Sequence, residues 1–155
     1  MARLLHTGWT VGPDGGPVPE HVLAAGPVPA VVPGTVHTDL LAAGLIPDPY
    51  LDENESLLAW IGLPDRLYET TVSLGAVDGE RRVLVLHGLD TVATVEVDGR
   101  VVLEAADAQQ QALGSRPCVN HHPDDAVRKM ACNFGWDWGP DLVSACCCGP
   151  TYGAR

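Results

Sequence analysis

The sequence is poor in positive charge. It holds nine Lys and Arg residues against 20 Asp and Glu residues, which gives a formal net charge of −11 at pH 7 and a pI near 4.7. Proteins that bind nucleic-acid backbones or anionic membrane surfaces need clustered Lys and Arg side chains, and the nine here are scattered along the chain. We therefore expect no nucleic acid and no membrane among the partners, and a ligand that is either neutral or a protein.

Long apolar runs are also missing. The first ten residues, MARLLHTGWT, hold only a few apolar positions before polar ones intervene, and no later segment is a long uncharged apolar stretch. The sequence therefore predicts neither a signal-peptide core nor a transmembrane span. A length of 155 residues makes one domain the default. We expect a cytoplasmic protein.

The cysteines lack the number and spacing of a disulfide framework. There are five, an odd number, at Cys118, Cys132, Cys146, Cys147 and Cys148. Three adjacent cysteines cannot easily wrap one zinc ion, because tetrahedral sites use ligands separated by a turn. His121 and His122 stand between two of the cysteines, but no second spaced pair completes a site. We expect no metal and no cofactor.

Proline and glycine are concentrated near the N-terminus. Six of the 13 prolines fall in residues 12–34, a composition that breaks both helix and strand. We interpret residues 1–34 as a Pro/Gly-rich N-terminal arm. Thr35 is then predicted to cap a short helix near the N-terminus, with Leu40 and Leu41 facing inward and Gly44 at its C-terminal end. The acidic stretch 52–55 is interpreted as a solvated loop.

The middle of the chain has the period of β-strands. Residues 67–74 alternate as in a half-buried strand, with Tyr68, Thr70, Val72 and Leu74 on one face. The apolar run 83–86 predicts a strand covered on both faces, and the segment 92–97 predicts a strand with Val95 and Val97 inward. Asp98-Gly99 predicts a two-residue hairpin turn into a further strand. We predict an antiparallel, mostly β domain.

A short aromatic and acidic run follows. Residues 134–140 read Phe-Gly-Trp-Asp-Trp-Gly-Pro, which places a carboxylate between two indoles in a segment that glycine and proline favour as a loop. Indole rings lie against the apolar face of a pyranose, and a carboxylate accepts strong hydrogen bonds from sugar hydroxyls. The alternative to a sugar site is that the tryptophans pack into the hydrophobic core and Asp137 is exposed to solvent. Trp136, Asp137 and Trp138 are therefore candidate substrate-binding residues.

Several separated segments together resemble one family. They are Val32–Leu40 (VPGTVHTDL), Gly44–Tyr50 (GLIPDPY), Gly88–Thr91 (GLDT) and the stretch from Arg128-Lys129 to Pro140 that ends in FGWDWGP. In this order they look like the N-terminal sugar-binding domain of β-mannosidases of glycoside hydrolase family 2. The resemblance implies an incomplete, galactose-binding-like jelly-roll β-sandwich that occupies residues 35–143, with an irregular tail over residues 144–155.

The resemblance also implies roles for the aromatic run. Trp136 would form a wall of the sugar subsite, Asp137 would hold sugar hydroxyls, and Trp138 would support the loop; the partner would be a β-mannoside carbohydrate. The two catalytic carboxylates, which stand about 5 to 5.5 Å apart in retaining enzymes, would belong to a barrel domain that this chain lacks. We therefore expect no catalytic residue in this chain and no turnover by the chain alone.

Three departures from the family pattern limit the carry-over. Asp65-Arg66 stands where relatives have Asp followed by Trp, which predicts thinner packing over Tyr68. Only an alanine-glutamine stretch separates the hairpin at Asp98-Gly99 from Val119-Asn120-His121-His122-Pro123, which predicts a deletion of strands, and the final cysteine run fits nothing in the family. Two alternatives stay open: a free-standing weak carbohydrate-binding or scaffold module, and a non-functional gene remnant.

Overall fold

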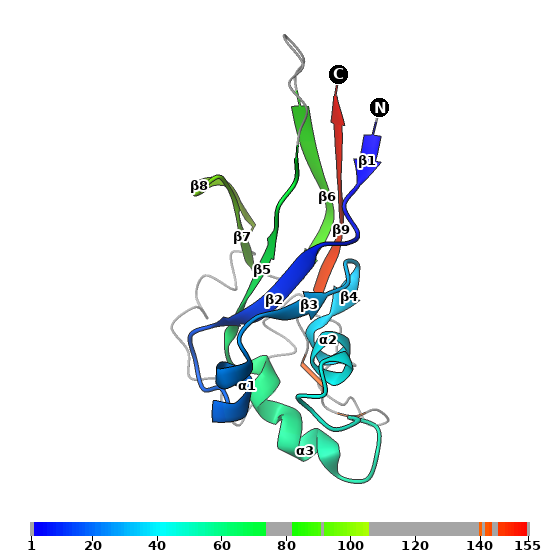
Figure 1. Ribbon diagram of the computed structural model, residues 1–155, viewed down its shortest axis with the longest axis vertical. Coiled ribbons are helices and arrows are strands. Elements are labelled where there is room, and N and C mark those ends of the chain that lie inside the picture. The colour runs from blue at the N-terminus through cyan, green and yellow to red at the C-terminus, as the bar shows by residue number, and fades with distance from the viewer. Residues whose placement is uncertain are drawn as a thin grey trace.

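The chain is a small, mostly β protein with a few short helices (Figure 1). The computed structural model describes residues 2–73, 82–90, 92–105, 140, 142–143 and 146–154. The elements within these residues are β1 (Ala2–Leu4), β2 (Trp9–Asp14), α1 (Glu20–Ala25), β3 (Val28–Ala30), β4 (Gly34–Thr35), α2 (Val36–Ala42), α3 (Asn54–Leu58), the 3-10 helix η1 (Ala59–Gly62), β5 (Asp65–Thr70), β6 (Arg82–Asp90), β7 (Ala93–Val97), β8 (Arg100–Ala105) and β9 (Cys146–Ala154).

All strand pairs are antiparallel, as the sequence predicts, and they form three sheets. β9 is the centre of the largest sheet: it pairs with β6 along one edge, and with β4 and β1 in succession along the other. A second sheet has the order β3-β2-β5, and β7 and β8 form a separate hairpin. Over the described residues these sheets do not close into a complete sandwich.

The hydrophobic core lies between the sheet β3-β2-β5 and the helices. Figure 1 shows α1, α2 and α3 below β2 and β3 in the view, on the side away from the two chain termini. One cluster of buried aliphatic residues joins these elements: Val11, Val22, Val28, Ala30, Val36, Leu40, Ile46, Leu58 and Ile61. Trp9, Trp60 and Tyr68 pack on it while remaining partly exposed. Full burial of such side chains is worth about 1.5–3 kcal/mol each, so this cluster is the main source of stability.

The predicted short helix is confirmed as α2. The Thr35 hydroxyl oxygen accepts a hydrogen bond from the Thr38 N–H at 3.4 Å, and the Thr35 N–H donates in return to the Thr38 hydroxyl at 3.3 Å, which is a capping box. Gly44 has a φ of 69°, as expected at a helix C-terminus. Leu40 is buried, but the expectation that Leu41 also faces inward was wrong, since it is 39% exposed. Val36 and Leu40, four residues apart, form the inward face instead.

The prediction that residues 1–34 form an arm without helix or strand was wrong. This segment contains β2, α1 and β3 and contributes Val11 and Val22 to the core. The prolines occupy positions that regular structure tolerates. Pro19 is the N-cap of α1, where a backbone N–H is not needed by the helix, and Pro29 lies in β3, which is an edge strand among the strands that the structure describes.

The predicted strands of the middle segment are confirmed, except that the strand expected over residues 67–74 ends at Thr70, before Val72. In β5 the residues Arg66, Tyr68 and Thr70 are half-buried and alternate with exposed ones, as the period predicts. β6 forms where the apolar run 83–86 indicated a strand, but burial on both faces was wrong: Leu84 and Val85 are each 41% exposed. The described strands form no second layer over these side chains.

The hairpin turn is confirmed in detail. Asp98 and Gly99 both have positive φ, 50° and 72°, and connect β7 to β8. The register shifts between Val95 and Glu96, so that Val95 pairs with Leu103 while Glu96 pairs with Val101. Val97 was expected to face inward but is 44% exposed, since nothing in the described part of the chain covers this face.

Two further expectations were wrong. Residues 146–154, predicted as part of an irregular tail, form β9, because pairing with β6 satisfies the backbone whatever the side-chain period is. In the acidic stretch 52–55, Asp52 and Glu53 are exposed as predicted, but α3 begins at Asn54. The alanine-glutamine stretch that follows Ala105 lies outside the described residues.

Candidate functional site

The candidate sugar-binding residues Trp136, Asp137 and Trp138 lie outside the described residues. The nearest described positions along the chain are Pro140 and the pair 142–143, all half-buried. Of these positions, Val143 has a described packing contact.

The segment after the aromatic run lies against Gly62 at the end of η1. A Cβ atom added at Gly62 would lie 2.8 Å from the Val143 Cβ and 3.1 Å from its Cγ1. Real Cβ atoms essentially never come this close to a neighbour, so only glycine fits here without displacing Val143. Two segments about 80 residues apart in sequence are thus packed backbone against side chain.

Arg66 holds η1 in place from the neighbouring strand β5. Its Nη2 donates a hydrogen bond to the Ile61 carbonyl oxygen at 2.9 Å, and its guanidinium carbon lies 5.4 Å from the centroid of the Trp60 ring. Burial lowers the pKa of Arg66, while Tyr68 and Asp65 act in the opposite direction; an arginine nonetheless stays protonated at any relevant pH. The result is a cation–π contact supported by a charge-assisted hydrogen bond.

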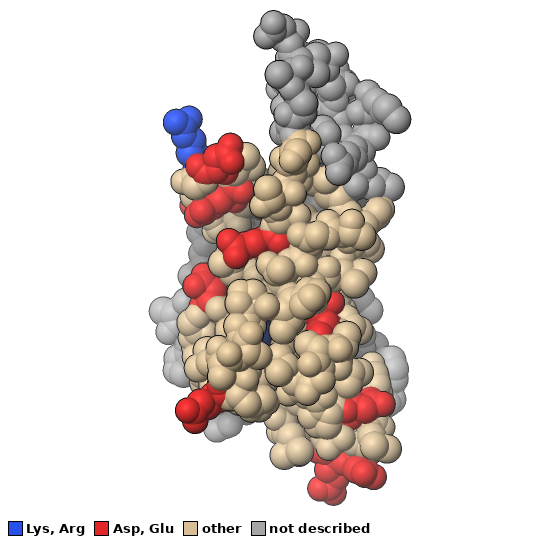
Figure 2. Space-filling model, in the orientation of Figure 1, with Lys and Arg blue, Asp and Glu red and all other residues tan. Residues whose placement is uncertain are grey.

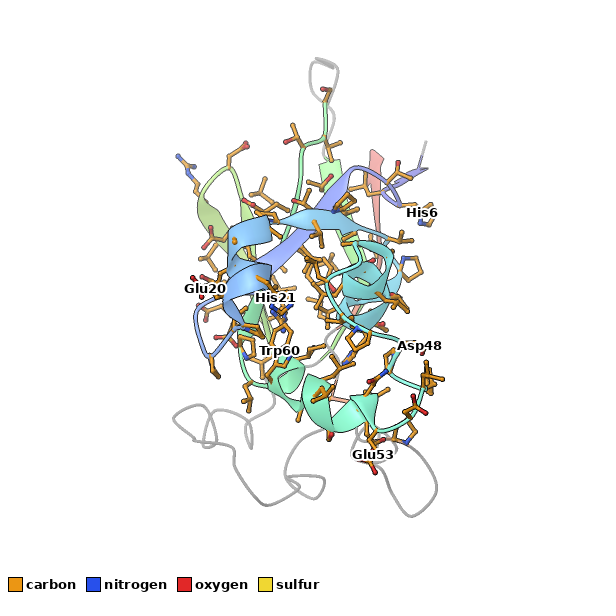
Figure 3. All side chains as sticks on the ribbon, turned by 60° about the horizontal axis from the view of Figure 1, so that its bottom comes forward. His6, Glu20, His21, Asp48, Glu53 and Trp60 are labelled. Atoms are coloured by element: carbon orange, nitrogen blue, oxygen red, sulfur yellow. The ribbon has the colours of Figure 1, made fainter. Side chains whose placement is uncertain are left out.

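The contacts of Arg66 bear on the expectation that packing over Tyr68 is thin because Arg66 replaces a tryptophan. Arg66 occupies the place of an expected tryptophan and lies partly buried against Trp60, and Tyr68 packs on the core cluster. The Arg66–Trp60 pair was not predicted. The two residues are six positions apart on either side of a helix-to-strand turn, and sequence separation does not fix the distance across such a turn. Figure 3 shows Trp60 and Glu53 at opposite ends of the α3–η1 segment.

The first turn of α2 buries two polar side chains, His37 and Asp39. Asp39 Oδ1 accepts a hydrogen bond from the Val31 N–H at 3.1 Å, which ties α2 to the chain before the cis Val32–Pro33 bond. Burial raises the pKa of Asp39, and the bond from Val31 opposes this shift. Asp39 Oδ2 has no hydrogen-bond partner among the described residues.

The buried Nδ1 of His37 has no hydrogen-bond partner within the described part of the structure. Burial, with a further contribution from the positive charge of Arg66, lowers the pKa of His37 to about 4. The imidazole is therefore neutral at pH 7. It is 7% exposed, which makes it a buried structural residue and unsuited to contact a sugar.

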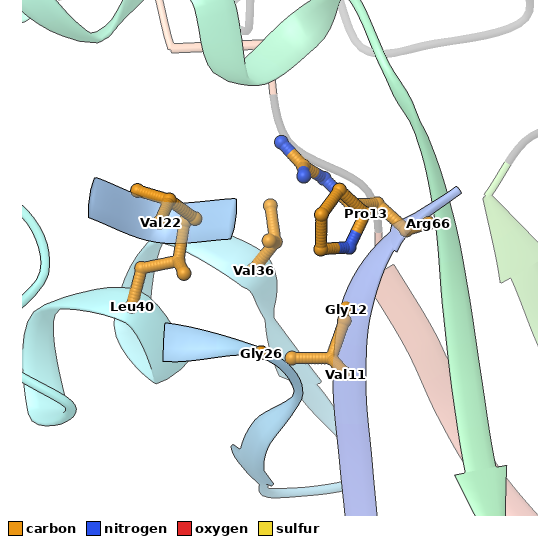
Figure 4. Close-up of a pocket in the computed structure, with 8 residues that line it drawn as sticks. All are labelled: Val11, Gly12, Pro13, Val22, Gly26, Val36, Leu40 and Arg66. Carbon is orange, nitrogen blue, oxygen red and sulfur yellow. The ribbon is translucent and has the colours of Figure 1, made fainter. Parts of the chain in front are cut away.

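The hollows formed by the described residues do not have the character of a sugar site. A cavity of about 10 Å³ lies between α1, α2 and β2, lined by aliphatic side chains and Arg66 (Figure 4), which is room for one water molecule. A groove of about 200 Å³ runs past Leu23, Pro27, Leu67 and Glu69. It has no aromatic wall, and ligand pockets usually measure about 300–1,000 Å³.

Acidic side chains are scattered over one face of the molecule. Figure 2 shows Asp and Glu side chains spread over the visible face. Within the described ranges, no group of three or more His, Cys, Asp or Glu residues could hold a metal ion. None of the helices that the structure describes is long and apolar enough to cross a membrane.

Comparison with known proteins assigns the family. The sequence profile described as "Glycosyl hydrolase 2 galactose-binding domain-like" matches residues 9–112 and 103–151. The chain belongs to this family. Its incomplete, mostly β fold agrees with that assignment: a solved β-D-mannosidase from Dictyoglomus thermophilum superposes with a TM-score of 0.75 over 99% of this chain, at 22% identity. The likeness confirms the predicted galactose-binding-like fold.

Curated relatives of this galactose-binding-like chain are β-mannosidases. Beta-mannosidase B of Thermothelomyces thermophilus is 34% identical over 154 residues, which cover 76% of this chain and 18% of the relative. Beta-mannosidase B of Emericella nidulans is 30% identical over 180 residues, which cover 92% of this chain and 21% of the relative. The chain thus spans about a fifth of the length of the curated relatives that it matches.

The alignments also bear on the predicted loss of strands. The alignment with the Emericella protein has 180 positions, whereas 92% of 155 residues is about 143, so about 37 positions hold no residue of this chain. The two profile matches meet at residues 103–112. This is the place where the sequence predicted a deletion, at the end of β8 and the start of the alanine-glutamine stretch.

Proposed function

We propose that this chain is the sugar-binding, N-terminal portion of a β-mannosidase-type glycoside hydrolase. The observation that carries the proposal is the family match over most of the chain, together with relatives named β-mannosidase B that align to as much as 92% of it. The proposed ligand is a terminal β-mannoside. The chain would position the sugar for hydrolysis rather than cleave the bond.

Trp136, Asp137 and Trp138 are the proposed sugar contacts. The support is chemical: these three residues place two indole faces and one carboxylate together in sequence, between glycine and proline. The hollows described above offer no comparable combination, since their linings are aliphatic and hold one charged residue each, Arg66 or Glu69. The net charge of −11 also suits a neutral ligand better than an anionic one.

The proposal is tested by titrating the purified chain with methyl β-D-mannoside and measuring binding by calorimetry or ligand-observed NMR. One loop offers only part of a binding site, so we expect weak binding. Asp137→Asn keeps the shape of the side chain and removes its charge. Because hydrogen bonds to a charged group are worth about 1.5–3 kcal/mol, this change is expected to weaken binding about tenfold or more.

Matched variants control for general effects of substitution. Asp98→Asn makes the same change in the β7–β8 turn, where Asn tolerates the positive φ, and should leave binding unchanged. Trp136→Ala is expected to abolish binding, whereas Tyr50→Ala removes an aromatic ring that is 79% exposed and should have no effect. A wild-type chain that unfolds cooperatively but shows no mannoside binding would sink the proposal in favour of a scaffold. Absence of both properties would indicate a gene remnant.

We also propose a cytoplasmic location. The support is the odd, clustered set of five cysteines, since unpaired thiols persist in a reducing compartment. Thiol titration of protein taken directly from cells should find all five cysteines reduced. Protected, oxidised cysteines would contradict this location.

A further inference from the structure

A groove of about 200 Å³ crosses the outward face of β2 and β5 and passes the end of α1. Its volume lies between the room that one water molecule needs and the volume of a small-molecule pocket, which is about 300–1,000 Å³. A groove of this size suits a side chain of a partner protein. The described residues that line it are Gly12, Pro13, Leu23, Gly26, Pro27, Leu67 and Glu69.

The floor of this groove carries few side-chain atoms. A Cβ atom added at Gly12 would lie 3.5 Å from the Pro27 Cγ, so β2 and the segment after α1 pack closely there. Figure 4 shows Gly26 beside Gly12, and a Cβ added at Gly26 would meet nothing within 4 Å. Leu23 and Leu67 line the groove and are 57% and 47% exposed. The groove is therefore an open apolar channel in which a long side chain can lie.

Carboxylates stand on both sides of Leu67 along β5. Asp65, Leu67 and Glu69 share the outward face, because they alternate with half-buried residues. Glu69 lines the groove, and the structure gives its side chain no ion pair or hydrogen bond among the described residues. Asp65 lies opposite Asp14 of β2, and both are exposed. Like charges at directly opposed positions destabilise a sheet, so a cation bound here would relieve their repulsion.

The neighbouring arginine does not neutralise this face. Arg66 interacts electrostatically with Asp65, but its guanidinium lies against Trp60 and the Ile61 carbonyl oxygen, on the covered side of the sheet. The described lining of the groove holds neither Lys nor Arg. The outward face of β5 therefore offers an acidic, an apolar and an acidic position in succession.

We propose that this groove docks an extended segment of a partner protein in which alternate side chains are basic, apolar and basic. An extended chain advances about 3.3 Å per residue and points alternate side chains to one face, so an Arg-x-Leu-x-Arg segment matches the spacing of Asp65, Leu67 and Glu69. Arginine suits both ends, because its aliphatic stem covers apolar surface while its guanidinium binds a carboxylate through two hydrogen bonds. This docking site does not depend on the proposed sugar-binding function.

The test titrates the isotope-labelled full chain with the peptide acetyl-Arg-Ala-Leu-Ala-Arg-amide and follows the backbone amide resonances by NMR. We expect saturable shifts at Leu23, Gly26, Leu67 and Glu69, and an affinity that falls as the salt concentration rises. The control peptide carries citrulline in place of both arginines, which keeps their shape and removes their charge. It should bind about five- to tenfold more weakly, because two exposed ion pairs are lost. Equal binding of the two peptides, or the absence of shifts around the groove, would overturn the proposal.

Variants of the chain assign the effect to the groove. Glu69→Gln and Asp65→Asn should each weaken binding of the arginine peptide about two- to fivefold, and should change binding of the citrulline peptide much less. Glu96→Gln makes the same change at an exposed position of β7 and should have no effect. Leu67→Ala should weaken both peptides alike, because it removes an apolar contact. Equal effects of Glu69→Gln and Glu96→Gln would refute the assignment to the groove.

Two further measurements separate other occupants and the sugar site. Sedimentation of the chain alone tests for a second copy as the occupant: self-association that Glu69→Gln abolishes would overturn the choice of a partner protein. Methyl β-D-mannoside should not displace the peptide, and peptide binding should persist even if the chain binds no mannoside. Competition between the two ligands would place the sugar in the groove and contradict this assignment.

Discussion

The chain has two regions that bury their apolar residues to different extents. Among the residues that the structure describes, the ten buried hydrophobic residues all lie between Val11 and Ile61, where helices cover the sheet β3-β2-β5. In residues 82–105 no described side chain is fully buried, and several large ones are more than 40% exposed: Leu84, Val85, Val92, Val97, Val101, Val102 and Leu103. Similar side chains thus have opposite environments.

The difference shows what closes a core. In the first region, helices only five to seven residues long suffice, because each brings aliphatic side chains onto one face of a sheet. In the second region the strands pair through their backbones but have no covering layer among the described residues. The alignment with the Emericella protein holds about 37 positions without a residue of this chain, and the two profile matches overlap at residues 103–112, at the end of this region. Backbone pairing alone does not make a sandwich.

The largest expected effect is a core truncation in the first region. Leu58→Ala removes a side chain that is 3% exposed and should lower the free energy of unfolding by about 2–5 kcal/mol. Leu57→Ala, one position along α3 and 66% exposed, should change it by less than about 0.5 kcal/mol. Urea unfolding of the purified variants measures both values.

The same truncation in the second region sharpens the contrast. Leu103→Ala in β8, where the side chain is 41% exposed, should cost less than half as much as Leu58→Ala. If the two variants were equally destabilised, the hairpin would share the cooperative core, and the contrast between the regions would be wrong.

The next effect concerns pH and the buried polar groups of the first region. The pKa of His37 is lowered to about 4 in the folded protein, whereas an unfolded histidine titrates near 6.5. The unfolded chain therefore takes up the proton first. Neutral His37 contributes fully to the free energy of unfolding above pH 6.5, and this contribution is lost as the pH falls towards 4. Since one pKa unit corresponds to about 1.36 kcal/mol, the loss is at most about 3 kcal/mol.

Asp39 acts in the opposite direction over an acidic range. Its raised pKa means that ionisation destabilises the fold as the pH rises above 3.8, so acidification relieves this penalty. The effect of His37 is isolated by comparing the Asp39→Asn variant with the double variant that also carries His37→Gln, because neither protein has a carboxylate at position 39. Guanidinium unfolding at several pH values between 7 and 4 should show a flatter profile for His37→Gln. His21→Gln, on the exposed side of α1, should retain the wild-type slope.

The smallest expected effect is in the hairpin. Gly99→Ala puts a Cβ at a φ of 72° and should destabilise the β7–β8 turn by about 1–2 kcal/mol. If the hairpin opens independently, amide exchange should quicken in β7 and β8 and remain unchanged in β2 and β5. Faster exchange in β2 would show that the regions unfold together. Asp98→Asn, which tolerates the same backbone region, is the control.

Local signals in the sequence predicted much of the fold. The Thr35 cap, Gly44 and the Asp98-Gly99 turn depend on neighbouring residues, and all three are confirmed. The alternation of β5 is also confirmed, because one face of that strand meets the core. These features need no knowledge of distant contacts.

Features set by distant partners could not be predicted from local pattern. β9 forms from a cysteine-rich segment because β6 pairs with it, and Pro29 is compatible with β3 because that strand is at the edge of its sheet among the described strands. The burial of β6 was overestimated, since composition cannot tell whether a second layer exists. At the candidate site, the resemblance supplied the aromatic run, whereas the Gly62–Val143 contact became visible only in three dimensions.

The position of β9 has a consequence for how the protein is made. Among the described strands, β1, β4 and β6 do not pair with one another; each of them pairs with β9, and Ala2 pairs with Gly153. During synthesis β1 therefore cannot pair until β9 has left the ribosome. The helical region can assemble early, while the large sheet is completed only when translation has passed residue 154, and such long-range pairing is intrinsically slow. In the interval the waiting strands are exposed to chaperones and to neighbouring nascent chains.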